Sequence, residues 1–358
     1  MTPELQAIAA KVAASQSTLV VVDAIDLAAA EAALSFARSC SAIVAHAEPD
    51  DIEVLQNQGY FTTSPSEAAL RGDVVLVVGA LSDNAISDEG FNRILNKPDL
   101  KAVVHLDTGD SPAIKTPIAK PERIAVSADE LPDVLGTVTA MMADRPVNGE
   151  TAIAAKAAHL RETLENATYG IMAHETGRLP RYSLFAAMAL ADELSKTTRW
   201  SLLPVGRASG QSELIRMTQA TSGLPPPLQF NACRGHHDSA TLDPQALTED
   251  GDVQTLVWIS ASTSPRPAWL RKAPTLIAID ANPKADADHH ITTGVAGVDY
   301  TALLDPSELS AFIALKPSGE TRDDLALAPL LATLTEHVLE QLPKPVLNAA
   351  AQVEAVSS

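Results

Sequence analysis

Short runs of apolar residues alternate along this chain with longer stretches in which apolar residues recur every three or four positions. The short runs are rich in Val, Ile and Leu, as in strands that are buried on both faces of a sheet. The longer stretches have the spacing of helices that bury one stripe. Such alternation is typical of β-α-β units around a mainly parallel sheet. It predicts strands at Thr18–Val22, Ala42–His46, Val74–Val78, Val103–Leu106, Ile124–Val126, Thr168–Ala173, Ser201–Leu203, Thr255–Ser260 and Thr275–Ile279.

The clearest helical pattern follows a capping signal. Ser127, with Glu130 three residues later, has the pattern of a capping box. The apolar stripe that follows comprises Leu131, Val134, Leu135, Val138, Met141 and Met142. Gly223–Pro227 is rich in proline and predicts an extended connector, because proline is not tolerated inside a helix. Further helices are predicted at Ala152–Asn166, Ser183–Lys196, Gln211–Ala220 and Pro329–Leu342.

A length of 358 residues allows two hydrophobic cores. The polar turn Asp144–Gly149 is typical of a boundary between units. We therefore expect a first α/β domain over 1–147 and a second over 148–345, with the alternative that the first strand or helix packs on the second domain. The remaining residues, 346–358, have little to pack against and are expected to form a flexible tail.

Net charge narrows the classes of function. The chain carries 26 basic and 45 acidic residues, a net charge of −19, with no basic block. This balance argues against nucleic-acid binding, which needs clustered Lys and Arg, and is compatible with a basic partner subunit or a cationic ligand. The first residues lack the pattern of a signal peptide, and no apolar run is long enough to cross a membrane. The expected location is the cytoplasm.

Cysteine usage excludes several kinds of site. Cys40 and Cys233 are the two cysteines of the sequence, and no C-x-x-C motif occurs. A disulfide framework, a zinc site or an iron-sulfur cluster would need more cysteines at closer spacing.

The most polar cluster of the chain is Asn231–Asp238, with Arg234, His236 and His237 within it. Adjacent histidines point in different directions on most backbones and seldom bind one metal together. A second pair, His289-His290, follows Asp286 and Asp288. This spacing allows a metal site built from two loops, but nothing in it requires one. We favour solvated or interfacial loops for both pairs.

Two glycine positions follow predicted strands. Gly79 ends a central strand, where α/β folds bind ligands, and Gly206–Gly210 lies between a strand and a helix, where backbone N–H groups could hold an anion. Neither matches a dinucleotide-binding or P-loop pattern, so structural turns are favoured.

Two acid-base pairs also stand at strand ends. His105 with Asp107, and His174 with Glu175, could transfer protons, although such pairs more often cap the next helix. The nucleophile elbow G-x-S-x-G is absent from the sequence.

The order of four segments resembles a known family. Thr198–Gly206, Asn231–Asp238, Gln254–Ser262 and Pro274–Asp280 are similar to parts of the catalytic B subunit of tungsten- or molybdenum-dependent formylmethanofuran dehydrogenases, which are molybdopterin oxidoreductases. The resemblance implies two Rossmann-like α/β/α domains. It also implies that Arg234 is the best remnant of an active-site residue, since the matching loop of the family, Ser-Arg-Gly-Tyr-Pro, has its arginine near the metal.

The chain departs from that family where the redox chemistry resides. Met1–Gln16 contains no cysteine, whereas a ferredoxin-like module precedes Thr18 in the dehydrogenases. The family's metal-binding cysteine follows the strand matching Ala42–His46, and here that position reads Ala47-Glu-Pro-Asp-Asp51. Tungsten or molybdenum needs that sulfur ligand. We therefore expect the fold of the molybdopterin oxidoreductases without the iron-sulfur module, and with no metal or cofactor.

The chain more closely resembles the B subunit of the formyltransferase/hydrolase complex of methylotrophic bacteria, a relative without either cofactor. This resemblance implies a non-catalytic subunit whose partners are an amidohydrolase-type A, a β-helical C and a formyltransferase D subunit. Such a complex moves formyl from tetrahydromethanopterin to a methanofuran analogue and releases formate.

Two other functions remain open. One is a redox-active subunit with a pterin cofactor, and the other is an anion- or nucleotide-binding protein that reuses the pterin crevice. The candidate residues of the remnant crevice are Gly79, Gly206, Asn231, Arg234, His236 and His237.

Overall fold

The structure is a computed structural model that describes residues 3–60, 62–109, 111–117, 120–148, 151–231, 234–282, 286–305, 311–317 and 319–342. Cys233 and the tail expected over 346–358 lie outside these residues. The described chain forms two compact units. We call residues 49–207 the inserted unit, because they interrupt the other. The terminal unit comprises the described residues 3–48, 208–305 and 311–342.

The inserted unit is built on a five-stranded parallel sheet in the order β5-β4-β3-β6-β7. Its strands are β3 (Val74–Val78), β4 (Ala102–Asp107), β5 (Glu122–Ala125), β6 (Tyr169–Glu175) and β7 (Arg199–Val205). Successive residues of a strand point to opposite faces, and both faces of β3 are buried, so helices are needed on each side.

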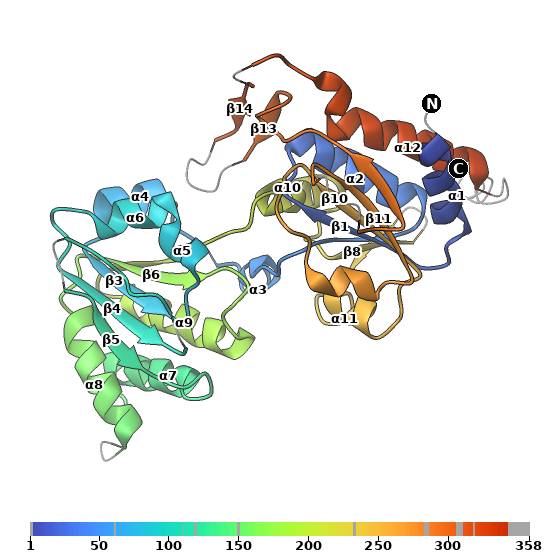
Figure 1. The fold of residues 1–358 in the computed structure, drawn as a ribbon. Coiled ribbons are helices and arrows are strands. Elements are labelled where there is room, and N and C mark those ends of the chain that lie inside the picture. The colour runs from blue at the N-terminus through green and yellow to red at the C-terminus, as the bar shows by residue number, and fades with distance from the viewer. Residues whose placement is uncertain are drawn as a thin grey trace, which may run out of the picture. The chain divides into compact units, whose positions relative to one another are not determined.

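Helices cover both faces of this sheet (Figure 1). One face packs against α7 (Leu131–Met142), α8 (Ala152–Leu164) and α9 (Arg181–Leu194). The other packs against α4 (Pro65–Arg71), α5 (Asp83–Ser87) and α6 (Glu89–Leu95). The short α3 (Ile52–Asn57) precedes them.

The capping box expected before α7 forms in full. The N–H of Ser127 donates to the Glu130 carboxylate at 3.1 Å, and the N–H of Glu130 donates to the Ser127 hydroxyl at 3.2 Å.

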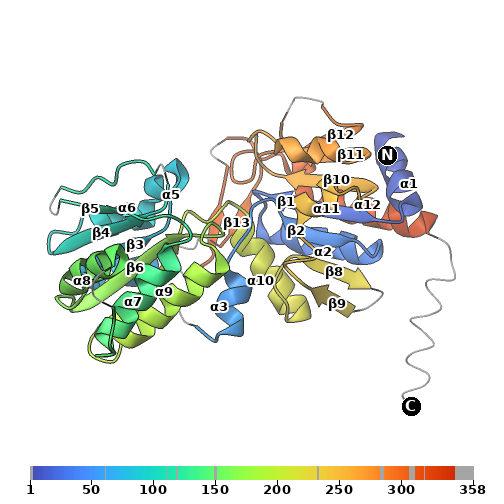
Figure 2. The ribbon, with the colours of Figure 1, turned by 90° about the horizontal axis from the view of Figure 1, so that it is seen from below.

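The terminal unit has a seven-stranded sheet in the order β12-β11-β10-β1-β2-β8-β9, which Figure 2 shows from edge to edge. The five strands β12, β11, β10, β1 and β2 run parallel. Strand β8 pairs antiparallel with β2, and β9 pairs antiparallel with β8. Their bounds are β1 (Thr18–Asp23), β2 (Ile43–His46), β8 (Leu228–Asn231), β9 (Arg234–His237), β10 (Thr255–Ser260), β11 (Thr275–Asp280) and β12 (His289–Thr292).

Four helices bury one face of this sheet: α1 (Pro3–Ala14), α2 (Leu27–Ser39), α10 (Gln211–Ser222) and α12 (Leu327–Gln341). The other face, centred on Trp258, is covered by α11 (Pro244–Glu249) and the 3₁₀ turn η1 (Ala268–Lys272). A separate antiparallel hairpin, β13 (Ala302–Leu304) and β14 (Ile313–Leu315), precedes the 3₁₀ turn η2 (Asp323–Leu325).

The chain does not divide between residues 147 and 148 as expected. In the inserted unit α7 packs on α8, and β3 pairs with β6, so both sides of that position share one core. The expected alternative, in which the first strand joins the later part of the chain, is the arrangement that forms: β1 pairs with β10 from Thr18↔Thr255 to Asp23↔Ser260. The polar turn is a connection between two helices of one unit.

Asn231–Asp238 is also different from the expected loop. Asn231 ends β8 and Arg234–His237 form β9 at the edge of the sheet, while residues 232 and 233 lie outside the described chain. Every strand and helix predicted by apolar patterning is present, with bounds that differ by a few residues at most.

Candidate functional site

Open α/β sheets bind ligands at the carboxyl ends of their strands, where the strand order reverses. In the terminal unit this position lies between β1 and β10, because the chain continues from β1 to β2 on one side and from β10 to β11 on the other. In the inserted unit it lies between β3 and β6. These two crevices are the candidate sites, and each is described within its own unit.

Backbone of the terminal unit fills the first crevice. The Ser209 carbonyl accepts a hydrogen bond from the N–H of Ala24 at 2.9 Å and lies 3.0 Å from Nε2 of His46. On the other side, the N–H of Ala261 donates to the Ala24 carbonyl at 3.0 Å, and Ala296 donates to Ala261 at 3.2 Å. Peptide groups that could hold a ligand at the end of β1 are therefore used within the fold.

A buried charged network lies at the carboxyl end of β11. Nε and Nη2 of Arg266 donate to the two carboxylate oxygens of Asp280 at 2.6 and 3.0 Å. Nε2 of His290 lies 3.1 Å from the same carboxylate, and Asp286 forms a second ion pair with Arg266. The side chains of Asp280 and Arg266 are only 1% and 5% exposed. The hydrogen-bonding groups of this network are paired with one another, which is the geometry of a network that stabilises the fold.

Carboxylates elsewhere at this edge are costly to ionise. Burial raises the pKa of Asp23, and a hydrogen bond from the Ser260 hydroxyl at 3.1 Å offsets only part of the rise. Burial likewise raises the pKa of Asp26 and of Glu213, which accepts the N–H of Asp305 at 2.8 Å. An anionic ligand bound here would make these carboxylates still harder to ionise. No group of three or more potential metal ligands occurs within the described parts of the chain.

The stability changes caused by Asp23→Asn and Asp73→Asn should depend on pH in opposite directions. The pKa of Asp23 is raised by folding, so the stability it contributes is present below its unfolded pKa and lost as the pH rises through the folded value. Burial also acts to raise the pKa of Asp73, but the ion pair with Lys101 at 2.7 Å and the N–H groups of Tyr169 and Thr168 lower it overall. Stability from Asp73 is therefore lost as the pH falls through its folded pKa.

Urea unfolding at about pH 3 and about pH 7 measures both effects. The change in the free energy of unfolding caused by Asp23→Asn should be more stabilising at the higher pH. The change caused by Asp73→Asn should be more destabilising there. Two changes that vary with pH in the same direction would contradict the assignment.

In the inserted unit a side chain of the protein takes the place of a ligand anion. The Glu175 carboxylate accepts hydrogen bonds from the N–H and the hydroxyl of Ser82, at 2.6 and 2.7 Å, and Nε of Arg178 lies 2.8 Å from it. Ser82 is the N-cap residue of α5, the first helix after β3. The donors at the end of β3 are thus directed to Glu175, which is 5% exposed.

The histidines at these strand ends are equally enclosed. Nε2 of His105 lies 2.8 Å from the Gly79 carbonyl, and burial lowers the pKa of His105. Asp107 accepts the Ser111 hydroxyl at 2.5 Å and pairs with Arg123, while Nε2 of His174 lies 3.1 Å from Asp51. With His105 3% and His174 0% exposed, neither reaches solvent as an acid or base would need to.

The glycines expected near a ligand are instead packed against the protein. A Cβ at Gly79 would lie 2.9 Å from Leu179, and one at Gly206 would lie 2.8 Å from Ala85. Leu179 and Ala85 therefore leave no room for a side chain at Gly79 or Gly206. Glycine at both positions has a reason in packing.

Asn231, Arg234, His236 and His237 lie on the β8–β9 hairpin. Strand β8 pairs with Ile43 and Val44 at the start of β2, so the Asn231↔Arg234 pair extends past the amino end of β2. His236 and His237 lie level with Ile43 and Val44, in the amino-terminal half of that strand. Ligands of such folds bind at the opposite edge. Arg234 is exposed and forms no ion pair with the described residues. Its position is that of a surface residue on a sheet edge.

The two histidine pairs cannot share a metal. His236 and His237 are on β9, and His289 and His290 are on β12, at opposite edges of the seven-stranded sheet. Six strand spacings of about 4.8 Å separate these edges by roughly 29 Å. Instead Nδ1 of His289 lies 2.9 Å from the Glu4 carboxylate, and His290 joins the Arg266 network.

Sequence patterning singles out Glu175 only as a strand-end acid-base candidate beside His174, and it does not single out Arg266. Arg266 stands in a polar stretch with no motif, 14 positions before Asp280. Glu175 ends an apolar run, but its partner Ser82 is 93 positions away. The one available signal was the position of Asp280 and Glu175 at the ends of apolar runs, where a carboxylate must find a donor. Within the described chain, no helix is both long and apolar enough to span a bilayer.

Comparison with known proteins gives a likeness in fold to solved structures. No family model matches the chain, and no curated protein matches it in sequence. The fold matches a chain in the crystal structure of the formyltransferase/hydrolase complex (FhcABCD) from Methylorubrum extorquens in complex with methylofuran, with a TM-score of 0.77 and 22% identity. This protein has the fold of that chain. The match covers 94% of this chain and 96% of the relative, so the two α/β units with helix-flanked sheets are shared from end to end.

Proposed function

We propose that this chain is a non-catalytic, B-type structural subunit of a formyltransferase/hydrolase complex, with the molybdopterin-oxidoreductase fold and no iron-sulfur module. Such a complex would move formyl from tetrahydromethanopterin to a methanofuran analogue and release formate. Its partners would be amidohydrolase-type A, β-helical C and formyltransferase D subunits. The observation that carries the proposal is the end-to-end match with a chain of a multi-subunit complex of this name.

The side chains present do not fit a tungsten or molybdenum pterin. Ala47-Glu-Pro-Asp-Asp51 offers no thiolate, and the Asp51 carboxylate already accepts the N–H of Gly177 at 3.0 Å. Burial raises the pKa of the Cys40 thiol to about 12, so it is not a thiolate at neutral pH. No reaction step is therefore assigned through such a cofactor, and a redox role is disfavoured.

The occupied crevices argue against independent binding of an anion or nucleotide. Glu175 in one unit and Asp23 in the other place carboxylates where a phosphate would bind, and burying two like charges together is costly. A protein of this fold that lacks its own reaction centre can still contribute surface and shape to an assembly.

The test is purification of the tagged chain from native extract under mild conditions, with mass spectrometry of the proteins that accompany it. We expect stoichiometric recovery of the three partner subunits, and molybdenum and tungsten at trace level in the intact complex. Stoichiometric molybdenum or tungsten bound to this chain would favour the redox-active alternative. A monodisperse chain without any of those subunits would reject the structural role.

A further inference from the structure

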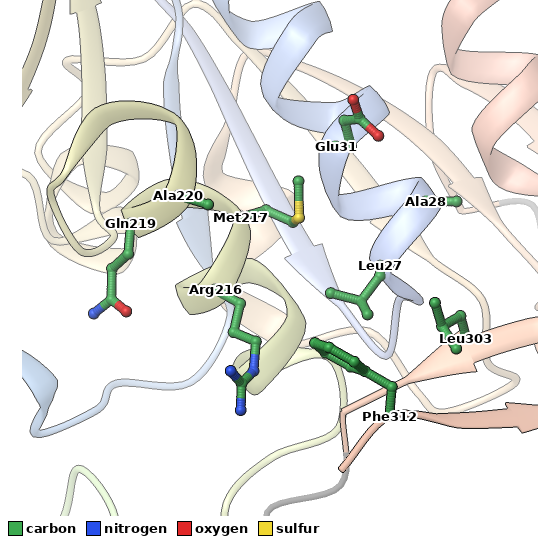
Figure 3. A pocket seen from close by; sticks show the side chains of 9 residues that line it. All are labelled: Leu27, Ala28, Glu31, Arg216, Met217, Gln219, Ala220, Leu303 and Phe312. Carbon is green, nitrogen blue, oxygen red and sulfur yellow. The ribbon is translucent and has the colours of Figure 1, made fainter. Parts of the chain in front are cut away.

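An apolar groove of about 720 Å³ opens on the terminal unit beside the β13–β14 hairpin. Figure 3 shows Phe312, which precedes β14, between Leu27 of α2 and Arg216 of α10. The complete lining consists of Leu27, Ala28, Glu31, Arg216, Met217, Gln219, Ala220, Leu303 and Phe312. All nine residues belong to the terminal unit, so the groove is complete within it.

Large apolar side chains are exposed around this groove. Leu303 and Phe312 line the groove and are 43% and 56% exposed, and Val298 and Leu315, which are outside the lining, are 61% and 41% exposed. They are four of the seven exposed large hydrophobic residues among those that the structure describes. Scattered exposed hydrophobic residues are ordinary, whereas a contiguous group usually marks a site of association. Leu303 and Phe312 form such a group in the groove, whereas Leu315 pairs with Ala302, the neighbour of Leu303, and so lies on the opposite face of the hairpin. We call the groove, with Leu303 and Phe312, the hairpin surface.

The hairpin is joined to the rest of the terminal unit by buried and charged contacts. Ala302 is fully buried, and the N–H of Asp305 donates to the Glu213 carboxylate at 2.8 Å. Arg216 pairs with Asp305 and lies over the Phe312 ring at 5.2 Å. The two strands are joined by three residue pairs, and within the described chain neither has another neighbouring strand. Two-stranded sheets are marginally stable in water, so a covering partner would stabilise this one.

Charge restricts what could cover the hairpin surface. The described residues of 298–326 carry five acidic side chains and two basic ones, Lys316 and Arg322. Asp305 is paired with Arg216, and Asp324 with Arg322, so three further acidic side chains and one basic one remain in the segment. Glu31 adds an exposed carboxylate in the groove. A second copy of this chain, with net charge −19, or an anionic membrane would meet like charge. A protein with a basic rim around an apolar centre is complementary.

We propose that the hairpin surface binds another protein subunit, which inserts an apolar side chain into the groove and places Lys or Arg opposite Glu31 and the acidic segment. This inference rests on the proposed function, since the partner would be a subunit of the same complex. Phe312 would be the central contact, because an exposed aromatic side chain held by a neighbouring cation is preorganised for binding.

The test uses the complex reconstituted from this chain and the A-, C- and D-type subunits of the same source. Phe312→Ala should weaken assembly by roughly thirtyfold, the effect of losing a central aromatic contact. Tyr182→Ala is the matched control, because Tyr182 is an aromatic residue of the inserted unit that is 79% exposed. Circular dichroism and thermal unfolding establish that both variants are folded, and hydrogen exchange reports on 297–305 and 311–317.

The expected result is slower exchange in those two segments on assembly, an affinity that falls as salt is added, and a loss specific to Phe312→Ala. Parent-like assembly by Phe312→Ala, or unchanged exchange in the hairpin of an intact complex, would overturn the inference and leave the proposed function standing. Failure of the parent to bind any of the three subunits would reject the proposed function itself. The chain alone could instead form a dimer or pellet with anionic vesicles. If Phe312→Ala abolished either behaviour, the occupant of the groove would be a second copy or a membrane, and the inference would be overturned.

Discussion

Arg266→Met should lower the free energy of unfolding of the terminal unit by about 3–5 kcal/mol, the usual cost of leaving a buried charge without its partner. Arg266 supplies two charge-assisted hydrogen bonds to Asp280, which is 1% exposed. Methionine retains much of the apolar volume of arginine, so loss of packing contributes little. Denaturant unfolding followed by the fluorescence of Trp258, which is buried in the same unit, measures the change.

Arg271→Met is the matched control for Arg266→Met. Arg271 pairs with Asp286, but its side chain is 58% exposed, so its removal should cost less than about 1 kcal/mol. Adding Asp280→Asn to Arg266→Met should recover part of the lost stability, because the unpaired buried charge is then removed. Equal effects of Arg266→Met and Arg271→Met would show that the network carries no stability beyond that of a surface pair.

Gly210→Ala should lower the free energy of unfolding of the terminal unit by roughly 2–5 kcal/mol, from left-handed strain together with steric overlap. Gly210 has a φ of +80°, and a Cβ there would lie 2.5 Å from the backbone nitrogen of Ile25 and 2.8 Å from that of Ala24. This glycine allows the Ser209 carbonyl to reach the end of β1, so its replacement should also open the filled crevice. Denaturant unfolding and hydrogen exchange at Ala24 measure the two effects.

Gly223→Ala separates strain from overlap. Gly223 ends the helix that Gly210 begins and has a φ of +75°, but no atom lies within 4 Å of its added Cβ. Its replacement should therefore cost about 1–2 kcal/mol, the strain alone. A Gly210→Ala variant as stable as Gly223→Ala would mean that the chain at Ala24 and Ile25 can move aside, and that the crevice is not firmly closed.

Apolar patterning predicted the central strands because burial on both faces leaves a local mark in the sequence. The edge strands β8 and β9 lack this mark: Asn231, Arg234 and His236 are polar, and the strands form because β2 offers an unpaired edge. Propensity for a strand depends strongly on such surroundings. The sequence pattern alone therefore predicts a loop for this segment, and the resemblance to the dehydrogenases suggests Arg234 as a crevice residue.

The division into units was not predictable from local signals either. Asp144–Gly149 has the composition of a linker, yet it connects two helices of one core. The actual boundaries depend on the pairing of β1 with β10, whose residues are more than two hundred positions apart. The polar crevices also depend on partners that are far apart in sequence, such as Ser82 and Glu175, which are separated by 93 positions. Neither periodicity nor a short motif encodes contacts of that range.

The interrupted path of the terminal unit has a consequence for synthesis on the ribosome. Strand β1 is made early, but its two neighbours in the sheet, β2 and β10, are synthesised at very different times. At about 5–20 residues per second, roughly 10–50 s pass between the emergence of Asp23 and that of Thr255. During this interval the contiguous inserted unit can fold, while an apolar edge of β1 stays open to chaperones or to aggregation. Slow elongation after residue 207 would therefore reduce the yield of native protein more than a pause of equal length after residue 292.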